Sequence, residues 1–394
     1  MANDAGANSG KDRKVYRDTN LQIIFGITLM AVLGVSSITP AFPTIARELN
    51  TSAQRVGLLI TVFTLPGVVL TPILGVLADR YGRKKIIIPA LMLFGIAGGA
   101  CFFARDFNAL LILRFFQGMG GGSLGSINTT LIGDIYEGRQ RAQAMGYNAS
   151  VLSVGTASYP LIGGALTLVA WHYPFLLSLI ALPIGLWVIL KLKNPEPKKP
   201  EDMRRYFRGI LKSINVQVVG LFFASILTFV ILYGVYLTYF PFLIKESFNG
   251  SPVVIGLLMS AMSLTTAVTS AQLGRLSDTF SHKKLLVWGF ILYSIALLSI
   301  PMIGHLWVLL IPAFVFGLGH GVNIPSILTL MSGFAPLEHR AAFMSMNSMV
   351  LRGGQTIGPP LMGLFYTLGG VDATFFAGAA LALIVMVILV FTLK

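Results

Sequence analysis

Long apolar segments alternate with short polar ones along the whole chain. Twelve of the apolar segments are long enough to cross a bilayer as helices, which takes about 17–25 residues each. They lie near residues 21–43, 56–78, 86–104, 109–133, 143–168, 173–192, 216–243, 253–276, 284–303, 306–331, 341–368 and 372–392. The polar segments between them carry charges or turn residues. The pattern predicts an all-α membrane protein with twelve transmembrane helices.

The longest polar segment, residues 194–215, separates the predicted helices into two sets of six. It begins with a proline-rich, charged stretch that is typical of a linker. Residues 204–214 within it are basic and amphipathic, which predicts contact with the anionic lipids of the cytoplasmic leaflet. The expected units are a cytoplasmic tail over 1–20, helix bundles over 21–193 and 216–394, and the cytoplasmic linker over 194–215.

The composition supports a membrane location. Hydrophobic residues make up 55% of the 394 residues and charged residues only 11%, with a mean hydropathy of +0.78. An average soluble domain has about a quarter of its residues charged, and it could not hide so much apolar surface. A bilayer can, because it solvates the outer face of each helix. The single cysteine, Cys101, excludes an intramolecular disulfide, and the polar N-terminus has no pattern of a cleaved signal peptide.

The basic residues are distributed unequally between the two sides of the membrane. If the N-terminus is cytoplasmic, 23 of the 29 Lys and Arg residues lie in cytoplasmic segments. This positive-inside pattern predicts that both termini are cytoplasmic, in the inner membrane of a bacterium or archaeon. It also explains the net charge of +14 without a nucleic-acid partner, because the basic residues are spread over seven segments.

The two predicted bundles repeat each other at an offset of 199 residues, which holds in three separate segments. The matching pairs include Gly75 and Gly274, Asp79 and Asp278, Lys84 and Lys283, Gly118 and Gly317, Asn148 and Asn347, Gly155 and Gly354, and Pro160 and Pro359. One register in three segments is hard to obtain by chance, so the chain is a duplicated six-helix unit. An even number of crossings makes the halves parallel, related by an axis along the membrane normal.

These segments also resemble the signature motifs of a transporter family. Residues 75–85 resemble the loop between helices two and three of the major facilitator superfamily. Residues 114–120 are similar to the helix-four motif of its drug–proton antiporter branch, and residues 155–164 resemble the helix-five antiporter motif, although the family prefers Gly where Tyr159 stands. The resemblance covers the whole chain. It implies two six-helix bundles around a central cavity and transport by alternating access.

The loop between helices two and three carries the first group of candidate functional residues. A simple positive-inside loop explains its basic residues but not the acid at the helix end or the flanking glycines. In the family this cluster latches the cytoplasmic side of the outward-open state, and its acid can bond to the amides at a helix N-terminus. We expect a weaker second copy, because Ser281 and His282 replace Gly82 and Arg83. The candidate gate residues are Gly75, Asp79, Gly82, Arg83, Asp134, Gly274 and Asp278.

Glycines and prolines of predicted helices five and eleven form the second group. Glycines let helices approach closely, and proline removes a backbone hydrogen bond and can kink a helix. Packing is the commoner role of such residues, but the resemblance associates a kinked, close-packed helix here with export. The residues are Gly155, Pro160, Gly163, Gly164, Gly358 and Pro359.

Polar residues inside the predicted helices form the third group. All fifteen acidic residues lie in loops or at helix ends, so no mid-membrane carboxylate can bind a cationic drug or a proton, as one does in many antiporters of the family. A charge inside the bilayer is costly and predicts a function. Arg114 could instead donate to backbone carbonyls and His320 could be a neutral core residue, whereas Arg352 has no acid in the helices to pair with. The substrate and coupling candidates are Arg114, Gln117, His320, Asn323, Arg352, Gln355 and Tyr236.

These features together predict a secondary transporter that exports small amphipathic compounds in exchange for protons. No nucleotide-binding loop, catalytic constellation or metal-ligand motif is evident, so we expect no cofactor, no metal and no enzymatic activity. A carrier of organic anions or lipid-like molecules is an alternative, because the ionisable interior is net positive. A receptor, scaffold or intramembrane enzyme would leave the duplicated halves unexplained. The expected partners are a small-molecule substrate, protons and membrane lipids, and the expected state is a monomer.

Overall fold

A computed structural model describes residues 15–122, 124–192, 216–334 and 340–393. Within these ranges the chain is helical and has no β-strand. Most of the predicted N-terminal tail and the linker with its amphipathic segment at 204–214 lie outside the described residues.

The described residues of the first half form eight α-helices. They are α1 (Thr19–Ser36), α2 (Phe42–Glu48), α3 (Ala53–Tyr81), α4 (Arg83–Ala100), α5 (Phe107–Gly121), α6 (Leu124–Ile135), α7 (Gly138–Val169) and α8 (Ala181–Lys191). Several begin at polar N-cap residues, because a cap side chain satisfies an amide that has no partner inside the helix. Asp18 accepts from the Asn20 amide at 2.7 Å, and Asp106 accepts from the Ala109 amide at 2.9 Å.

The second half continues with helices α10 to α16. They are α10 (Val216–Phe229), α11 (Phe240–Phe248), α12 (Pro252–Ala271), α13 (Leu273–Thr279), α14 (His282–Ser299), α15 (Leu310–Phe334) and α16 (Arg340–Thr392). A π-helix, η5 (Val230–Tyr239), joins α10 to α11 in one continuous helical segment. Wider π-turns of this kind often occur at functional sites.

Ten helical segments of the described chain are long and apolar enough to span a membrane. Two features account for the difference from the twelve predicted crossings. Helices α5 and α6 lie on either side of residue 123, within the single predicted helix 109–133. Helix α16 contains non-helical backbone at Gly369 and Gly370, between the two predicted helices 341–368 and 372–392. Gly370 has a φ of 70°, a conformation that favours glycine.

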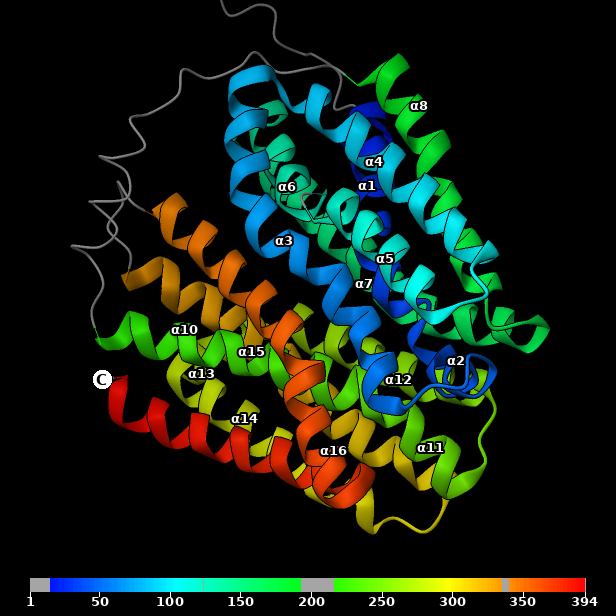
Figure 1. Ribbon diagram of the computed structural model, residues 1–394. Helices are drawn as coiled ribbons and strands as arrows, with labels where there is room; N and C mark the ends of the chain where they lie inside the picture. The colour runs from blue at the N-terminus through cyan, green and yellow to red at the C-terminus, as the bar shows by residue number, and fades with distance from the viewer. Residues whose placement is uncertain (1–14, 123, 193–215, 335–339, 394) are drawn as a thin grey trace, which may run out of the picture.

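The two halves form separate bundles that meet along two pairs of helices. Helix α3 packs against α16, and α7 packs against α12. Figure 1 shows the bundles converging toward α2, α11 and α12, which we call the closed end, and diverging toward the C-terminus. The opposite end, which carries Asp79, is called the Asp79 end. There, a Cβ atom built on Gly75 or Gly274 would meet no described atom within 4 Å.

The duplication is visible in the hydrogen bonds as well as in the sequence. The Thr71 hydroxyl donates to the Gly122 carbonyl at 2.8 Å, and the Ser270 hydroxyl donates to the Gly321 carbonyl at 2.9 Å. Donor and acceptor are shifted by the same 199 residues in both cases. The repeat therefore preserves a specific helix–helix contact, because a side-chain hydroxyl has to reach a neighbouring backbone in each half.

Candidate functional site

Arg83 brings the two acids of the predicted gate together. Its Nε lies 3.0 Å from a carboxylate oxygen of Asp134, and its Nη2 forms an ion pair with Asp79. The side chains of Arg83 and Asp134 are each only 8% exposed, whereas that of Asp79 is 46% exposed. Gly82 lies between α3 and α4 with a φ of 95°, which favours glycine at the turn. The cluster thus combines a largely buried ion pair with a second acid that faces outward.

The second copy of this loop is built differently. Asp278 lies in α13, and it has no ion pair within the described part of the chain. Ser281, which replaces Gly82, accepts from the Lys284 amide at 3.4 Å and so caps α14. This arrangement is consistent with the expected weaker copy, because the arginine that links two acids in the first half is absent.

One lysine of each loop has the same contact in both halves. The Lys84 ammonium donates to the Ile189 carbonyl at 2.6 Å, near the end of α8. The Lys283 ammonium donates to the Leu393 carbonyl, just after the end of α16. Both lysines satisfy carbonyls that have no partner at a helix C-terminus. These basic residues therefore have a structural role in addition to setting the charge of the loop.

The candidate glycines of α7 lie at close backbone approaches. A Cβ atom on Gly163 would lie closer than 3.0 Å to the Ser37 carbonyl, and one on Gly164 equally close to the Pro252 carbonyl. Gly256 of α12 faces the Pro160 carbonyl in the same way. Since only glycine fits at such distances, Gly164 and Gly256 let α7 and α12 pack backbone to backbone at the closed end, and Gly163 lets α7 approach the end of α1.

Gly155, Gly358 and Pro359 also lie at helix contacts. A Cβ atom on Gly155 would approach a Leu29 methyl group to 2.9 Å, and one on Gly358 would approach the Gly234 amide nitrogen to 2.9 Å. Pro359 faces Gly57 of α3. The residues of the second group therefore lie at close contacts between helices.

Arg114 is fully buried inside the first bundle. Its Nε donates to the Leu59 carbonyl at 3.3 Å, and its Nη1 donates to the Gln117 side chain at 2.6 Å. The guanidinium also lies 4.2 Å from the centre of the Phe63 ring. Gln117 in turn donates to the Ser178 hydroxyl at 2.8 Å. This geometry supports the structural alternative for Arg114, in which a carbonyl, an amide and a ring face accommodate the charge, although Nη2 has no hydrogen-bond partner among the described residues.

His320 and Tyr236 belong to an aromatic column inside the second bundle. Tyr236 stacks between Phe240 and Phe316, with ring centroids 4.7 and 4.8 Å away. Phe316 stacks on Tyr293 at 4.3 Å, and the Tyr293 hydroxyl is hydrogen-bonded to Nδ1 of His320. The direction of that hydrogen bond depends on the histidine tautomer. Asn323, one turn from His320, is fully buried in the same bundle.

Arg352 lies where the two bundles meet. Its guanidinium packs against Gly67 of α3, and a Cβ atom on Gly67 would lie 2.9 Å from Nη1. No carboxylate of the described residues is within ion-pair distance of Arg352. One turn along α16, Thr356 is hydrogen-bonded to α3: the Thr61 hydroxyl donates to its carbonyl at 2.9 Å, and the hydroxyls of Thr356 and Thr64 lie 2.9 Å apart, with either as the donor. Gln355 is half-buried in the same turn.

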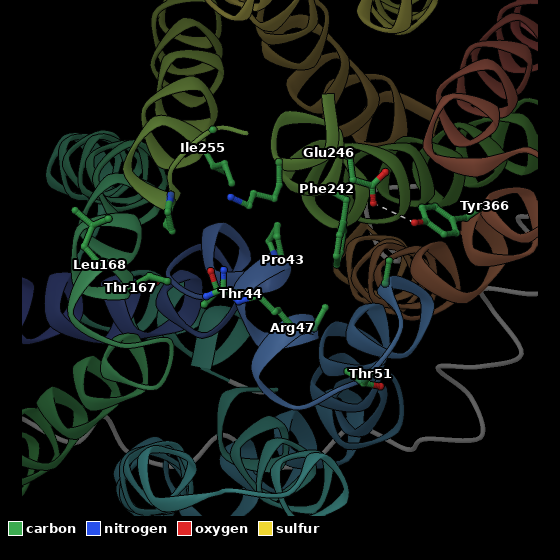
Figure 2. A pocket seen from close by; sticks show the side chains of 15 residues that line it. Pro43, Thr44, Arg47, Thr51, Thr167, Leu168, Phe242, Glu246, Ile255 and Tyr366 are labelled. Atoms are coloured by element: carbon green, nitrogen blue, oxygen red, sulfur yellow. Dashed lines mark hydrogen bonds between the residues drawn. The ribbon is translucent and has the colours of Figure 1, made fainter. Parts of the chain in front are cut away.

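A depression of about 530 Å³ lies at the closed end, between the bundles. Figure 2 shows Arg47 from the first half and Glu246 and Tyr366 from the second half around it. The Tyr366 hydroxyl donates to the Glu246 carboxylate at 3.1 Å. Sequence reasoning did not select this depression, because its residues come from six helices with no shared motif.

The loop at the closed end between α7 and α8 contains His172. Burial, reinforced by the nearby charge of Arg105, lowers the pKa of His172 below its ordinary value. The ring packs edge-on against Phe102, with centroids 4.7 Å apart. The neutral form is therefore favoured near neutral pH, which fits an aromatic packing residue.

Sequence reasoning also missed Gly67, Thr61, Thr64 and Thr356. A signal was present, because Gly57 and Pro359 of the same interface recur as Gly256 and Pro160 at the common offset. That recurrence marks both positions as repeated features of the fold, and the structure shows that they touch.

The comparisons with known proteins agree with this architecture. The family model of the Major Facilitator Superfamily matches residues 24–246 and again residues 221–394. The chain is 24% identical to the quinolone resistance protein NorA of Staphylococcus aureus (strain COL) over 348 residues, which are 87% of this chain and 89% of NorA. It is 26% identical to multidrug resistance protein 1 of Bacillus subtilis (strain 168) over 373 residues, covering 93% and 95% of the two chains.

Solved structures show the same fold at low sequence identity. A crystal structure of the nucleoside transporter NupG has a TM-score of 0.81 at 14% identity and covers 96% of this chain and 100% of that one. The D-xylose–proton symporter has a TM-score of 0.77 at 14% identity and covers 95% and 98%. Since the family model matches both halves, the chain is a multi-pass membrane transporter that belongs to the Major Facilitator Superfamily.

Proposed function

We propose that the chain exports small amphipathic compounds in exchange for protons. The support for export is its similarity to NorA and to multidrug resistance protein 1, which extends over most of each chain. The units of this transporter are the bundles 21–193 and 216–394, joined by the linker 194–215 and preceded by the tail 1–20. It acts as a monomer in the cytoplasmic membrane of a bacterium or archaeon, in contact with membrane lipids.

The positive-inside pattern supports a cytoplasmic location of both termini and of the Asp79 end. The structure then corresponds to an inward-facing state, since the bundles contact each other at the opposite end. Alternating access requires the contacts of α3 with α16 and of α7 with α12 to separate at the closed end. The gate residues Asp79, Arg83 and Asp134 stabilise the outward-facing state, in which the bundles approach each other at the Asp79 end.

The observation that carries the substrate class is the position of Arg352 between the bundles. A cation that faces the transport path in a low-dielectric environment repels another cation far more strongly than it would in water. Its guanidinium can also hold a carboxylate or phosphate through two parallel hydrogen bonds. The substrate is therefore neutral, zwitterionic or anionic, with a large apolar body.

Transport by purified protein in liposomes with a defined pH gradient tests this function. Octanoate and octylammonium form a matched pair, because they differ mainly in the charge of the head group. We expect the gradient to drive octanoate and not octylammonium, and Arg352→Ala to abolish the difference. Preferential transport of octylammonium by the wild type, unchanged by Arg352→Ala, would refute the proposed substrate class.

A carrier of organic anions or lipid-like molecules is the second candidate, and Arg352 favours it equally. The two candidates differ in breadth of substrate and in direction of transport. Inside-out vesicles from cells that overproduce the protein distinguish them. Uptake of several unrelated amphiphiles into such vesicles indicates a broad exporter, whereas uptake restricted to one anion or lipid indicates a dedicated carrier.

A further inference from the structure

Helices α3 and α16 run antiparallel and touch at several successive levels. Each level is a small set of contacting residues, here called a step. At the closed end, Gly57 faces Pro359, with a Cβ distance of 3.3 Å. Next, the hydroxyls of Thr61 and Thr64 bond to Thr356. The last step toward the middle of the membrane is the contact of Gly67 with Arg352. All the other steps join small or hydroxyl-bearing side chains, so an arginine is unexpected there.

The equivalent contact between α7 and α12 repeats the first step but not the last. At the offset of 199 residues, Gly256 and Pro160 correspond to Gly57 and Pro359, and they are also in close contact. Thr266 and Ser153 correspond to Gly67 and Arg352. Each of these two hydroxyls donates within its own bundle, Ser153 to the Ala149 carbonyl at 3.0 Å and Thr266 to the Gly317 carbonyl at 3.2 Å. The duplicated fold therefore does not require an arginine at this step.

Gly67 provides the space that Arg352 occupies. A methyl group at this position would lie 2.9 Å from Nη1, 3.0 Å from Cδ and 3.3 Å from Cζ of Arg352. Helix α3 thus lies against the Nη1 side of the guanidinium. An anion that binds Nη1 from this side has to displace Arg352 from Gly67.

We propose that Arg352 seated on Gly67 is a lock on the closed end, which an anionic group of the substrate releases, and that Gly67 is the positioning residue of this lock. The inference rests on the proposed function, since it assumes an anionic or zwitterionic substrate. An anion binds better to the released arginine than to the seated one, because more donors are available. A ligand shifts a conformational equilibrium only through such a difference in affinity. Release frees α3 from α16 and allows the closed end to open with substrate bound.

Cross-linking at the closed end measures the position of this equilibrium. The Thr39 hydroxyl lies 3.8 Å from the Met259 sulfur across the two halves. Thr39→Cys and Met259→Cys, in a Cys101→Ser background, place two thiols there and remove the only native one. The rate of reaction with a short bifunctional thiol reagent then reports how often the end is closed. Gel filtration and thermal unfolding of each variant show that it is folded.

A double-mutant cycle tests the contact without any ligand. Gly67→Ala should slow cross-linking several-fold when Arg352 is present and should have no further effect in Arg352→Ala. The reason is that the effects of substituting two contacting residues do not add. Gly57→Ala is the matched control, since it crowds Thr238 and Pro359 in the same interface. It should slow cross-linking equally with and without Arg352. Additive effects of Gly67→Ala and Arg352→Ala would overturn the lock. If Gly67→Ala unfolds the protein, Arg352→Ala alone tests the lock, because it should slow cross-linking several-fold and an unchanged rate would overturn the lock.

Ligands then test release by an anion. Octanoate should slow cross-linking several-fold in the parent and have no effect in Arg352→Ala, while octylammonium should have no effect in either. If the double-mutant cycle is non-additive but octanoate has no effect, release of the lock by an anion is overturned. The stabilising contact between Gly67 and Arg352 then still stands. A slowing by octylammonium instead would contradict the proposed substrate class. An additive cycle would contradict the lock even if octanoate slows cross-linking. Failure of the lock can therefore be distinguished from failure of the proposed substrate class.

Discussion

The two arginines inside the helices illustrate how environment decides the role of a residue. Arg114 has a carbonyl, an amide and a ring face as partners within one bundle, so its charge is accommodated locally. Arg352 lies between the bundles and has no carboxylate partner among the described residues. Moving the bundles leaves the surroundings of Arg114 intact but changes those of Arg352. Of the two arginines, Arg352 is therefore the one placed to sense the conformational state.

Arg83→Ala should abolish most transport while the protein is still produced and inserted. The substitution removes the side chain that links Asp79 and Asp134, and it leaves the largely buried Asp134 carboxylate without this partner. Initial transport rates in reconstituted liposomes check the expectation. Arg80→Ala is the control, because it removes the same charge from the same loop at an exposed position. Equal losses in the two variants would show that charge, rather than the link between acids, matters.

Proton coupling should depend on His320 or on the acids around Arg83. The only other ionisable residues well inside the predicted helices, apart from tyrosines, are Arg114 and Arg352, and arginine keeps its proton near neutral pH. We expect His320→Ala combined with Asp134→Asn to abolish substrate-dependent proton movement, measured with a pH-sensitive dye inside liposomes. The single variants show which site carries the proton. Coupling that survives in the double variant would require a different carrier.

At the scale of elements, glycines determine how closely the helices of opposite halves approach. Gly164 and Gly256 allow α7 and α12 to contact through their backbones, and a side chain at either position would separate the helices. The π-helix η5 adds a second irregular element at the interface. Its Thr238 hydroxyl donates at 2.6 Å to the carbonyl of Tyr233, five residues earlier. At these positions the interface between the halves is thus built from small residues and wide turns instead of large interlocking side chains.

Gly164→Ala should weaken closure of the α7–α12 contact, because its methyl group would collide with the Pro252 carbonyl. Overpacking of this kind costs about 1–3 kcal/mol. We expect a lower melting temperature in detergent and slower transport. Gly146→Ala is the matched control in the same helix, since a methyl group there would meet no described atom within 4 Å. The two variants should differ in both measurements, and equal behaviour would show that the close approach is not needed.

At the scale of the whole molecule, the two bundles are repeats of one unit, and they are in contact at one end of the molecule only. They meet at the closed end through α3 with α16 and α7 with α12, and they are apart at the Asp79 end (Figure 1). In a transporter that works by alternating access, the end that is closed has to open and the end that is open has to close in every cycle. Any covalent link across the closed end should therefore stop transport.

Cross-linking Thr39→Cys to Met259→Cys, in the Cys101→Ser background, should reduce transport to background. A reagent with a cleavable disulfide allows the activity to recover after reduction. Each single-cysteine variant treated with the same reagent controls for modification without a link. Full transport by the cross-linked protein, verified by mass spectrometry, would rule out opening of this end as a step of the cycle.

The membrane class, the approximate positions of the crossings, the duplication and the association of Asp79, Arg83 and Asp134 can be read from the chain alone. These properties follow from apolar segments of bilayer length and from a motif within one repeat, so they need no knowledge of distant contacts. The packing of the helices was needed to show that Arg114 has its partners inside one bundle while Arg352 lies on Gly67, 285 positions earlier in the chain. The physical reason is that the cost of a buried charge depends on its neighbours. Those neighbours come from helices whose packing is not encoded in any single segment.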